Sequence, residues 1–203
     1  RDDQSLAALR TLRPMNLYGW SKHLFDMAVV GRVAKGDALP PQWAGLKFFN
    51  VFGPNEYHKG SMMSVLTRRF SDVKDGRPVQ LFKSHREGIA DGDQRRDFIY
   101  VDDVVRVMVW LLATPSVSGL FNVGTGKARS FRDLMTAAYA SLGAKPKIEY
   151  VDMPEQIRGA YQYFTQADVS RLQGAGYNGG FTPLEEAVDA YVKGYLDRDD
   201  RFR

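Results

Sequence analysis

Strand and helix signals alternate along this sequence, and that alternation constrains the fold more than any other feature. Segments with helical periodicity or capping signals separate the short apolar segments from one another. The predicted strands are 46–52, 79–82, 97–101, 120–123 and 147–151. Alternation of this kind is typical of α/β proteins, so the sequence predicts an α/β fold.

Start and stop signals bound the predicted helices. The first helix carries Tyr18 and Lys22 and is expected to end near Gly36. Its predicted core-facing side chains are Leu24, Phe25, Ala28 and Val29. The later helices are expected to start at Ser61, at Asp102 or Asp103, at Ser130, at Thr165 and at Thr182, with Pro183 in the first helical position of the last one.

Composition excludes several classes of protein. The 203 residues are 44% hydrophobic and 26% charged, which is ordinary for a globular protein. With no cysteine and three histidines that lack ligand spacing, the sequence predicts no disulfide and no metal site, and it fits a reducing, cytoplasmic compartment. The net charge of +4 is scattered along the chain, so we expect no nucleic-acid partner. The most apolar window, 104–113, contains Arg106 and is too short to cross a membrane.

Tyr18 and Lys22 form the first candidate for chemistry. Residues four apart on a helix lie on one face, so the phenol and the ammonium can reach each other. A phenol is a poor base near neutrality, and a neighbouring ammonium favours its phenolate form. The pair therefore predicts an acid–base site, while a solvated helix face is the alternative reading of so short a pattern.

A second candidate follows the predicted strand 46–52, which Gly53 and Pro54 close. In an open α/β sheet, ligands bind at the carboxyl ends of strands. The site would include Asn50 at the strand end and His58 and Lys59 in the next loop. A charged surface turn is the alternative for the loop.

Three further features have both a functional and a structural reading. Arg96 has the planar guanidinium that suits phosphate oxygens, but it could also pair with its neighbour Asp97. Tyr161 and Tyr163 are two apart and would face opposite sides of a strand, where either could be core. The Gly-x-Gly at 124–126 lacks a third glycine, so we predict a tight turn there and no cofactor site.

Together these motifs resemble the extended short-chain dehydrogenase/reductase superfamily, whose signals here are the Tyr18 and Lys22 pair and the segments 49–54, 96–104 and 121–126. Within it, the chain more closely resembles the ADP-L-glycero-D-manno-heptose 6-epimerases. The narrower similarity lies in Glu-Tyr-His-Lys-Gly-Ser-Met at 56–62 and in the segment 160–168. The resemblance runs from about Pro14 to the C-terminus.

The resemblance implies a fold and a domain organisation. The expected fold is the C-terminal part of a Rossmann-like doubly wound sheet plus a smaller α/β substrate-binding domain. Residues 1–54 would be the remainder of a dinucleotide-binding domain, to which the strand at 119–124 returns, and 55–203 would bind substrate. The Gly-rich turn and the upstream catalytic Ser/Thr of the family are absent, so we expect the C-terminal portion of a longer enzyme.

The resemblance also implies an activity, which is inversion of C6 of an ADP-linked heptose by transient oxidation with NADP. The implied catalytic residues are Tyr18, Lys22 and Lys59, and these three with Val51 would bind the cofactor. The implied substrate contacts are Asn50, Ser61, Arg68, Phe82, Lys83, Ser84, His85, Arg96 and Tyr161. Two departures concern Arg68, where some relatives carry His, and the stretch 86–94, which is longer than its equivalent.

A homo-oligomer, a pentamer in the family, is implied by the resemblance alone, as is NADP in preference to NAD. Two alternatives remain open for the activity. The chain could belong to another nucleotide-sugar epimerase or dehydratase, because the superfamily motifs are shared among these enzymes. It could also be a sugar-nucleotide-binding fragment without catalysis. Lys59 is the main discriminator, because a 4-epimerase or dehydratase can work without a second lysine.

Overall fold

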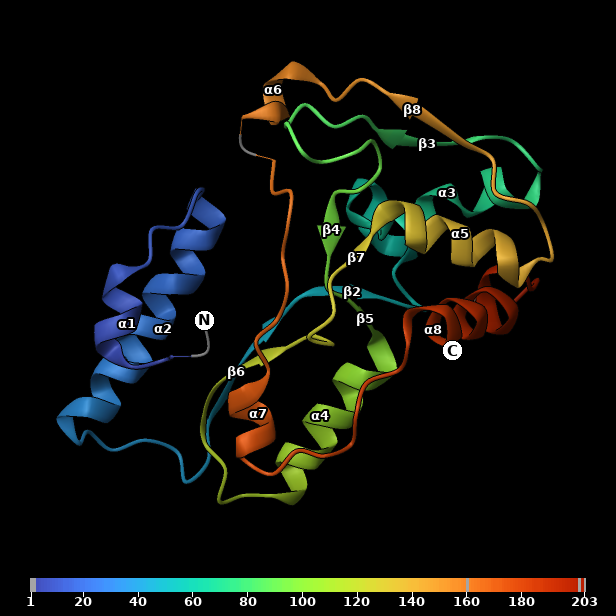
Figure 1. The fold of residues 1–203 in the computed structure, drawn as a ribbon. Coiled ribbons are helices and arrows are strands. Elements are labelled where there is room, and N and C mark those ends of the chain that lie inside the picture. The colour runs from blue at the N-terminus through green and yellow to red at the C-terminus, as the bar shows by residue number, and fades with distance from the viewer. Residues whose placement is uncertain (1–2, 160, 201, 203) are drawn as a thin grey trace.

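The computed structural model describes residues 3–159, 161–200 and 202 of the chain (Figure 1). Its helices are α1 (Leu6–Thr11), α2 (Leu17–Lys35), α3 (Val65–Lys74), α4 (Val101–Ala113), α5 (Phe131–Ser141), α6 (Glu155–Arg158), α7 (Ser170–Gly174) and α8 (Leu184–Tyr191), with a 3₁₀ turn η1 (Tyr57–Met62) and a π-helical turn η2 (Val192–Leu196). Its strands are β1 (Ala44–Phe48), β2 (Asn50–Phe52), β3 (Val79–Phe82), β4 (Arg95–Arg96), β5 (Phe98–Tyr100), β6 (Gly119–Val123), β7 (Arg129–Ser130) and β8 (Ile148–Val151).

The strands form parallel pairs connected through helices, which confirms the α/β prediction. β1 pairs with β6, β2 with β5 and β3 with β8, all parallel, and the short β4 and β7 pair antiparallel. Leu46 lies opposite Phe121, and Val51 lies opposite Ile99. Parallel neighbours need a crossover connection, and helices such as α3 and α4 lie within these crossovers.

The single predicted strand 46–52 is wrong, because the chain forms two strands, β1 and β2, that meet at Phe49. The Phe49 amide donates to the Val123 carbonyl at 3.0 Å, and the next amide, that of Asn50, donates to the Asp97 carbonyl at 2.9 Å. The chain thus changes its hydrogen-bond partner from β6 to the β5 side within one residue. Apolar composition alone cannot reveal such a change of partner.

Two hydrophobic clusters hold the elements together. In the larger cluster, α5 packs against α3, α8 and β3. Leu66, Met135 and Tyr191 are completely buried in this cluster. The smaller one joins β5, β6, α4 and α7 through Ile99 and Phe121. In Figure 1 the α1–α2 pair lies to one side of the helices of the larger cluster.

The predicted core face of α2 is wrong. The helix begins after Asn16 and ends at Gly36 as expected, with Gly36 in the left-handed conformation at φ 74°. However, the side chains of Leu24 and Phe25 are 60% and 70% exposed, Ala28 is exposed and Val29 is half-buried.

The buried residues of α2 are polar. His23 and Asp26 are buried, and the Asp26 carboxylate pairs with the Lys47 ammonium on β1. Which face a helix buries is decided by the element that packs on it, and α2 packs mainly on α1. The apolar residues that a sequence pattern assigns to the core therefore remain at the surface of this chain.

Four predicted helix starts need correction, the fourth being that of α4, which begins at Val101. Ser64, not Ser61, caps α3, and its hydroxyl accepts from the Thr67 amide at 3.3 Å. No helix starts at Thr165, because α7 begins at Ser170. Pro183 is the N-cap of α8 and not its first helical residue.

The last of these starts involves a long-range contact. The Thr182 amide and hydroxyl both donate to the Asp103 carboxylate, at 2.9 and 2.7 Å. Asp103 is buried inside α4, which begins at Val101 and not at either aspartate. Thr182 thus joins the start of α8 to α4 instead of capping its own helix.

Ser130 caps α5 as predicted, in a reciprocal capping box with Asp133. The turn at 124–126 is held by Asp97, whose carboxylate accepts from the Thr125 and Gly126 amides at 2.7 and 2.9 Å. Over the part of the chain that the structure describes, no helix is both long and apolar enough to cross a membrane.

Candidate functional site

The first candidate pair lies on the exposed first turns of α2. The side-chain oxygen Oδ1 of Asn16 accepts a hydrogen bond from the Gly19 amide at 2.8 Å and fixes the start of the helix. The Lys22 ammonium lies 5.2 Å from the centroid of the Tyr18 ring, and the Tyr18 side chain is 72% exposed. Lys22 also lines a cavity of about 710 Å³ between α2 and β1. The predicted pair is therefore adjacent and open to a ligand.

The second candidate lies where β2 ends. A side chain at Gly53 would place its Cβ 2.4 Å from Val101, so only glycine allows the strand to pass this close to α4. The loop that follows carries His58 and Lys59, both exposed. Lys59 and Val51 line one cavity of about 510 Å³, together with residues of β2, of α4 and of the loop.

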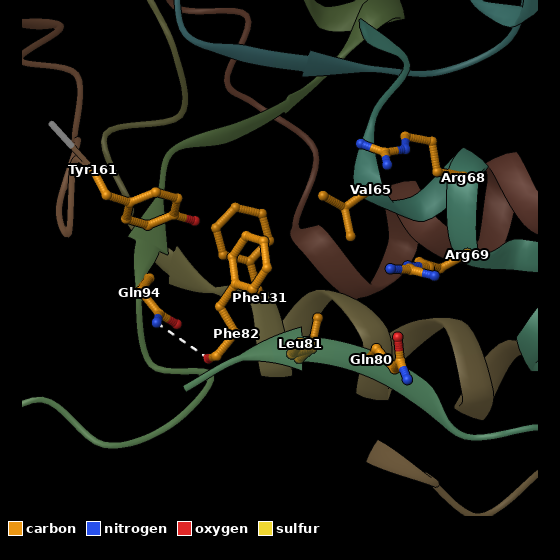
Figure 2. A pocket seen from close by; sticks show the side chains of 9 residues that line it. All are labelled: Val65, Arg68, Arg69, Gln80, Leu81, Phe82, Gln94, Phe131 and Tyr161. Carbon is orange, nitrogen blue, oxygen red and sulfur yellow. Dashed lines mark hydrogen bonds between the residues drawn. The ribbon is translucent and has the colours of Figure 1, made fainter. Parts of the chain in front are cut away.

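The third candidate is an aromatic cavity of about 110 Å³ between α3 and β3 (Figure 2). The sequence predicted three of its lining residues, which are Arg68, Phe82 and Tyr161. Figure 2 shows Arg68 on α3 facing across the cavity from Tyr161. The cavity thus combines aromatic rings with guanidinium groups, the chemistry that suits a base and a diphosphate.

Arg96 adjoins this cavity through its ring contacts. Its guanidinium lies 5.2 Å from the centroid of the Tyr161 ring and 5.6 Å from that of Phe131, and the residue is only 8% exposed. Among the residues that the structure describes, no carboxylate pairs with Arg96, and one of its N–H groups donates to the Arg95 carbonyl at 2.8 Å. Burial lowers the pKa of Arg96 and raises that of Tyr161.

A buried cation without a counter-ion is costly, and an incoming anion offsets that cost. The alternative reading of Arg96, an ion pair with its neighbour Asp97, does not apply, because the Asp97 carboxylate accepts from Thr125, Gly126 and Ala167 instead. Arg96 is therefore available to an anionic ligand.

Three predicted substrate residues lie on the loop after β3. They are next to the aromatic cavity but do not line it. Lys83 pairs with Asp152 at 3.6 Å, and the Ser84 amide donates to Asp91 at 2.6 Å. The His85 amide donates to the Tyr163 hydroxyl at 3.0 Å.

The His85 ring is held by the backbone on its other side. Its Nε2 accepts from the Met153 amide at 3.3 Å, which fixes the ring against the chain after β8. His85 thus ties the loop after β3 to two neighbouring segments, one at Tyr163 and one at Met153.

Two predicted substrate residues, Asn50 and Ser61, line neither the aromatic cavity nor the cavity at the end of β2. Asn50 is exposed at the start of β2, and Ser61 is exposed in η1. The Ser61 carbonyl accepts from the Arg68 guanidinium at 3.3 Å. The loop that carries Lys59 therefore contacts the arginine of the aromatic cavity, whereas no described contact connects Lys59 with Tyr18 or Lys22.

Sequence reasoning missed several lining residues. Arg69, Gln94 and Phe131 line the aromatic cavity, and Gln94 donates from its side chain to the Phe82 and Lys83 carbonyls at 3.2 and 3.1 Å. Arg69 could have been found as the neighbour of Arg68. Phe131 gives no such signal, because it reads as an ordinary first residue of a helix.

One expectation at this site is wrong. Tyr161 and Tyr163 do not face opposite sides of a strand, because their rings contact each other edge to face with centroids 5.7 Å apart. The segment is irregular at this point, so the alternation of a strand does not apply. Tyr163 holds the loop after β3 while Tyr161 faces the cavity.

Comparison with known proteins places these features in a family. Residues 2–124 match the family described as "NAD dependent epimerase/dehydratase family". The ADP-L-glycero-D-manno-heptose-6-epimerase of Nitratidesulfovibrio vulgaris (strain DP4) is 50% identical over 196 residues, which make up 97% of this chain and 59% of that protein. The chain therefore spans less than two thirds of the length of this relative.

Solved structures agree in fold. The crystal structure of Helicobacter pylori ADP-L-glycero-D-manno-heptose-6-epimerase matches with a TM-score of 0.67 at 25% identity, over 90% of this chain and 52% of that one. A structure of MoeE5 in complex with UDP-glucuronic acid and NAD matches with a TM-score of 0.66 at 28% identity, over 89% and 56% of the two chains.

Proposed function

The chain belongs to the NAD dependent epimerase/dehydratase family, and from this premise we propose that its parent protein interconverts the two C6 epimers of an ADP-linked manno-heptose. By parent protein we mean the complete natural polypeptide that carries these 203 residues. The proposal extends to this chain the name of a relative that is 50% identical. We further propose that the protein is a cytoplasmic homo-oligomer, pentameric as the resemblance implies.

The observation that carries the proposal is the position of Lys59. It lines a cavity with Val51 at the carboxyl end of β2, where ligands bind in open α/β sheets. This lysine is the residue that a 6-epimerase needs in addition to the pair on α2. Two acid–base groups, Tyr18 and Lys59, would then serve the two faces of one carbon.

A nicotinamide cofactor fits the residues at this cavity. Val51, Val101 and Val105 supply apolar walls, and Lys59 supplies one ammonium, a donor set suited to a flat ring with a polar edge. Val51, Lys59, Tyr18 and Lys22 would hold it, and we propose NADP. When bound, a nicotinamide supplies a reversible acceptor for the hydrogen that leaves the carbon with its electron pair.

The residues of this chain would then move the proton and hold the substrate. One base takes the proton of the C6 hydroxyl as the ketone forms. The other base returns a proton to the same oxygen after the ketone has rotated to present its opposite face. Lys22 would place its ammonium beside the Tyr18 phenol, 5.2 Å from the ring centroid. Neither step needs a proton from water.

Substrate binding would rest on the aromatic cavity. Arg96 and Arg68 would hold the diphosphate, because a guanidinium donates two parallel hydrogen bonds to phosphate oxygens. Phe82 and Tyr161, which line the cavity, would contact the base. Lys83, Ser84 and His85, on the loop after β3, would contact the substrate beside them. Asn50 and Ser61 would contact the sugar between the two cavities.

The test is to incubate the parent protein and NADP with one C6 epimer of the ADP-heptose and to follow the sugar protons by NMR. We expect the other epimer to appear, and we expect no deuterium at C6 when the reaction runs in heavy water, because the carbon-bound hydrogen never exchanges with solvent. UDP-glucose and a dTDP-hexose are the matched substrates. Turnover of either one in preference to the ADP-heptose would favour the wider epimerase or dehydratase reading, and binding without turnover would favour the non-catalytic reading.

A further inference from the structure

The loop that carries Lys59 is closed at its base by one buried carboxylate, Glu56. Glu56 is 3% exposed, and its Oε2 accepts from the Ser64 amide at 2.8 Å. Its Oε1 accepts from the Ser64 hydroxyl at 2.6 Å and also from the Thr67 hydroxyl. Two hydrogen bonds from Ser64 thus join the ends of the segment 56–64 through the Glu56 side chain, and a third, from Thr67, ties that side chain to α3.

Glu56 is held by hydrogen-bond donors and not by a cation. Across residues 3–159, 161–200 and 202, no lysine or arginine pairs with it. Ser64 is the N-cap of α3, so the carboxylate lies at the positive end of that helix. The Thr67 hydroxyl lies 3.0 Å from the Tyr191 hydroxyl of α8, which connects the network to the larger core cluster.

The backbone of the loop depends on this closure. The Lys59 amide donates to the Glu56 carbonyl at 3.0 Å, in the 3₁₀ turn that Glu56 begins. Asn55, just before this turn, and Gly60, within η1, have positive φ values of 68° and 54°. For asparagine such a conformation persists only where neighbouring contacts determine it.

The Lys59 side chain has no anchor of its own. It is exposed, and within the described part of the chain no carboxylate pairs with its ammonium. The region that the ammonium can reach is therefore limited by where the loop places the Lys59 backbone, and the Glu56 hydrogen bonds to Ser64 hold that loop closed.

We propose that Glu56 is a positioning residue for Lys59, which it holds at the mouth of the cavity at the end of β2. The inference rests on the proposed function, in which Lys59 is the second acid–base group. Proton transfer needs its groups within hydrogen-bond reach, and a displacement of about 1 Å can lower the rate about 100-fold. Loss of the closure at Glu56 should therefore impair the face that Lys59 serves and leave the face that Tyr18 serves.

The test compares Glu56→Ala with Lys59→Met in the parent protein loaded with NADP. The absorbance of the reduced cofactor is recorded in a single turnover from each C6 epimer. We expect Glu56→Ala to slow the same epimer that Lys59→Met slows, by about 10- to 100-fold, with the other epimer within about twofold of wild type. Glu56→Gln should restore most of the loss, because its amide oxygen still accepts from the Ser64 amide.

Tyr191→Phe is the matched control. It removes the hydroxyl at the far end of the same network and leaves the Glu56–Ser64 bonds in place. Both epimers should react at nearly the wild-type rate in this variant. If Glu56→Ala does not fold, Glu56→Asp supplies the same comparison, because its carboxylate is one methylene too short to reach both Ser64 donors.

Hydrogen exchange of the amides at 57–63 gives a readout that is independent of activity. Exchange should become faster in Glu56→Ala and stay unchanged in Lys59→Met. If Lys59→Met slows one epimer while Glu56→Ala slows both equally or neither, Glu56 has only a structural role and the inference is wrong. If Lys59→Met itself slows neither epimer selectively, the proposed function fails, and the role of Glu56 fails with it.

Discussion

The Arg96 guanidinium on β4 lies 5.2 Å from the centroid of the Tyr161 ring, although the two residues are far apart in the sequence. The contact matters because Arg96 is buried and, among the described residues, no carboxylate neutralises it. A guanidinium stacked on aromatic rings keeps the N–H groups in its own plane accessible, and apart from the one that donates to the Arg95 carbonyl these can bind an anion. The pair thus defines the part of the aromatic cavity that would hold a diphosphate.

We expect Arg96→Gln to weaken binding of ADP to the parent protein. A hydrogen bond to a charged group contributes about 1.5–3 kcal/mol, so the dissociation constant should rise about 10- to 100-fold. Isothermal titration calorimetry with ADP measures this directly. Arg95→Gln is the control, because Arg95 is the exposed neighbour on the same strand. Equal affinity in the two variants would rule out the phosphate role of Arg96.

Tyr18→Phe should lower epimerisation by about 10²–10⁴-fold, the usual contribution of one acid–base group. The substitution removes only the hydroxyl of a side chain that is 72% exposed, so folding should not change. Turnover by the parent protein and its circular dichroism spectrum are the two measurements. A variant that folds and turns over at the wild-type rate would show that Tyr18 belongs to a solvated helix face.

The ion pair of Arg129 with Glu185 predicts a small dependence of stability on pH. The Arg129 guanidinium donates to the Glu185 carboxylate at 2.6 Å and lowers its pKa below the ordinary value of 4.5. Because the folded pKa is the lower one, the pair stabilises the fold above about pH 4.5, and this stability is lost as the pH falls through the folded pKa.

Glu185→Gln should therefore lower the free energy of unfolding at about pH 7 by less than about 1 kcal/mol, because the carboxylate is 58% exposed. The difference from wild type should disappear at about pH 2. Urea unfolding at both pH values measures it, with Glu186→Gln on the same helix as the control. A difference that persists at acid pH would assign the effect to packing instead of charge.

Local signals predicted the parts of the fold that local physics decides. The stop at Gly36 needs a positive φ, and the start at Ser130 needs a side chain that accepts from Asp133, so both are visible in the sequence. The boundary between β1 and β2 was not visible, because Phe49 changes partner through contacts with distant strands.

The candidate site shows the same division. The sequence identified Lys59 and Arg68 as candidates by resemblance, and Arg68 lines the aromatic cavity while Lys59 lines the one at the end of β2. It could not show that Phe131 approaches Arg96, because that contact depends on how α5 packs against β4 and β5. Nor could the sequence show that Leu24 and Phe25 of α2 are exposed, because the burial of a helix face depends on which element packs against it.

Lys59→Met decides whether Tyr18 and Lys59 serve opposite faces of C6. Methionine keeps most of the apolar stem of lysine and loses the proton donor, so packing should change little. The measurement is the rate of cofactor reduction from each C6 epimer, by single-turnover absorbance in the parent protein. We expect one epimer to become slow by about 10²–10⁴-fold while the other reacts at nearly the wild-type rate, and we expect the reverse pattern from Tyr18→Phe. Equal, nearly normal rates from both epimers in Lys59→Met would show that the two residues do not divide the faces and that Lys59 is a surface residue of its loop.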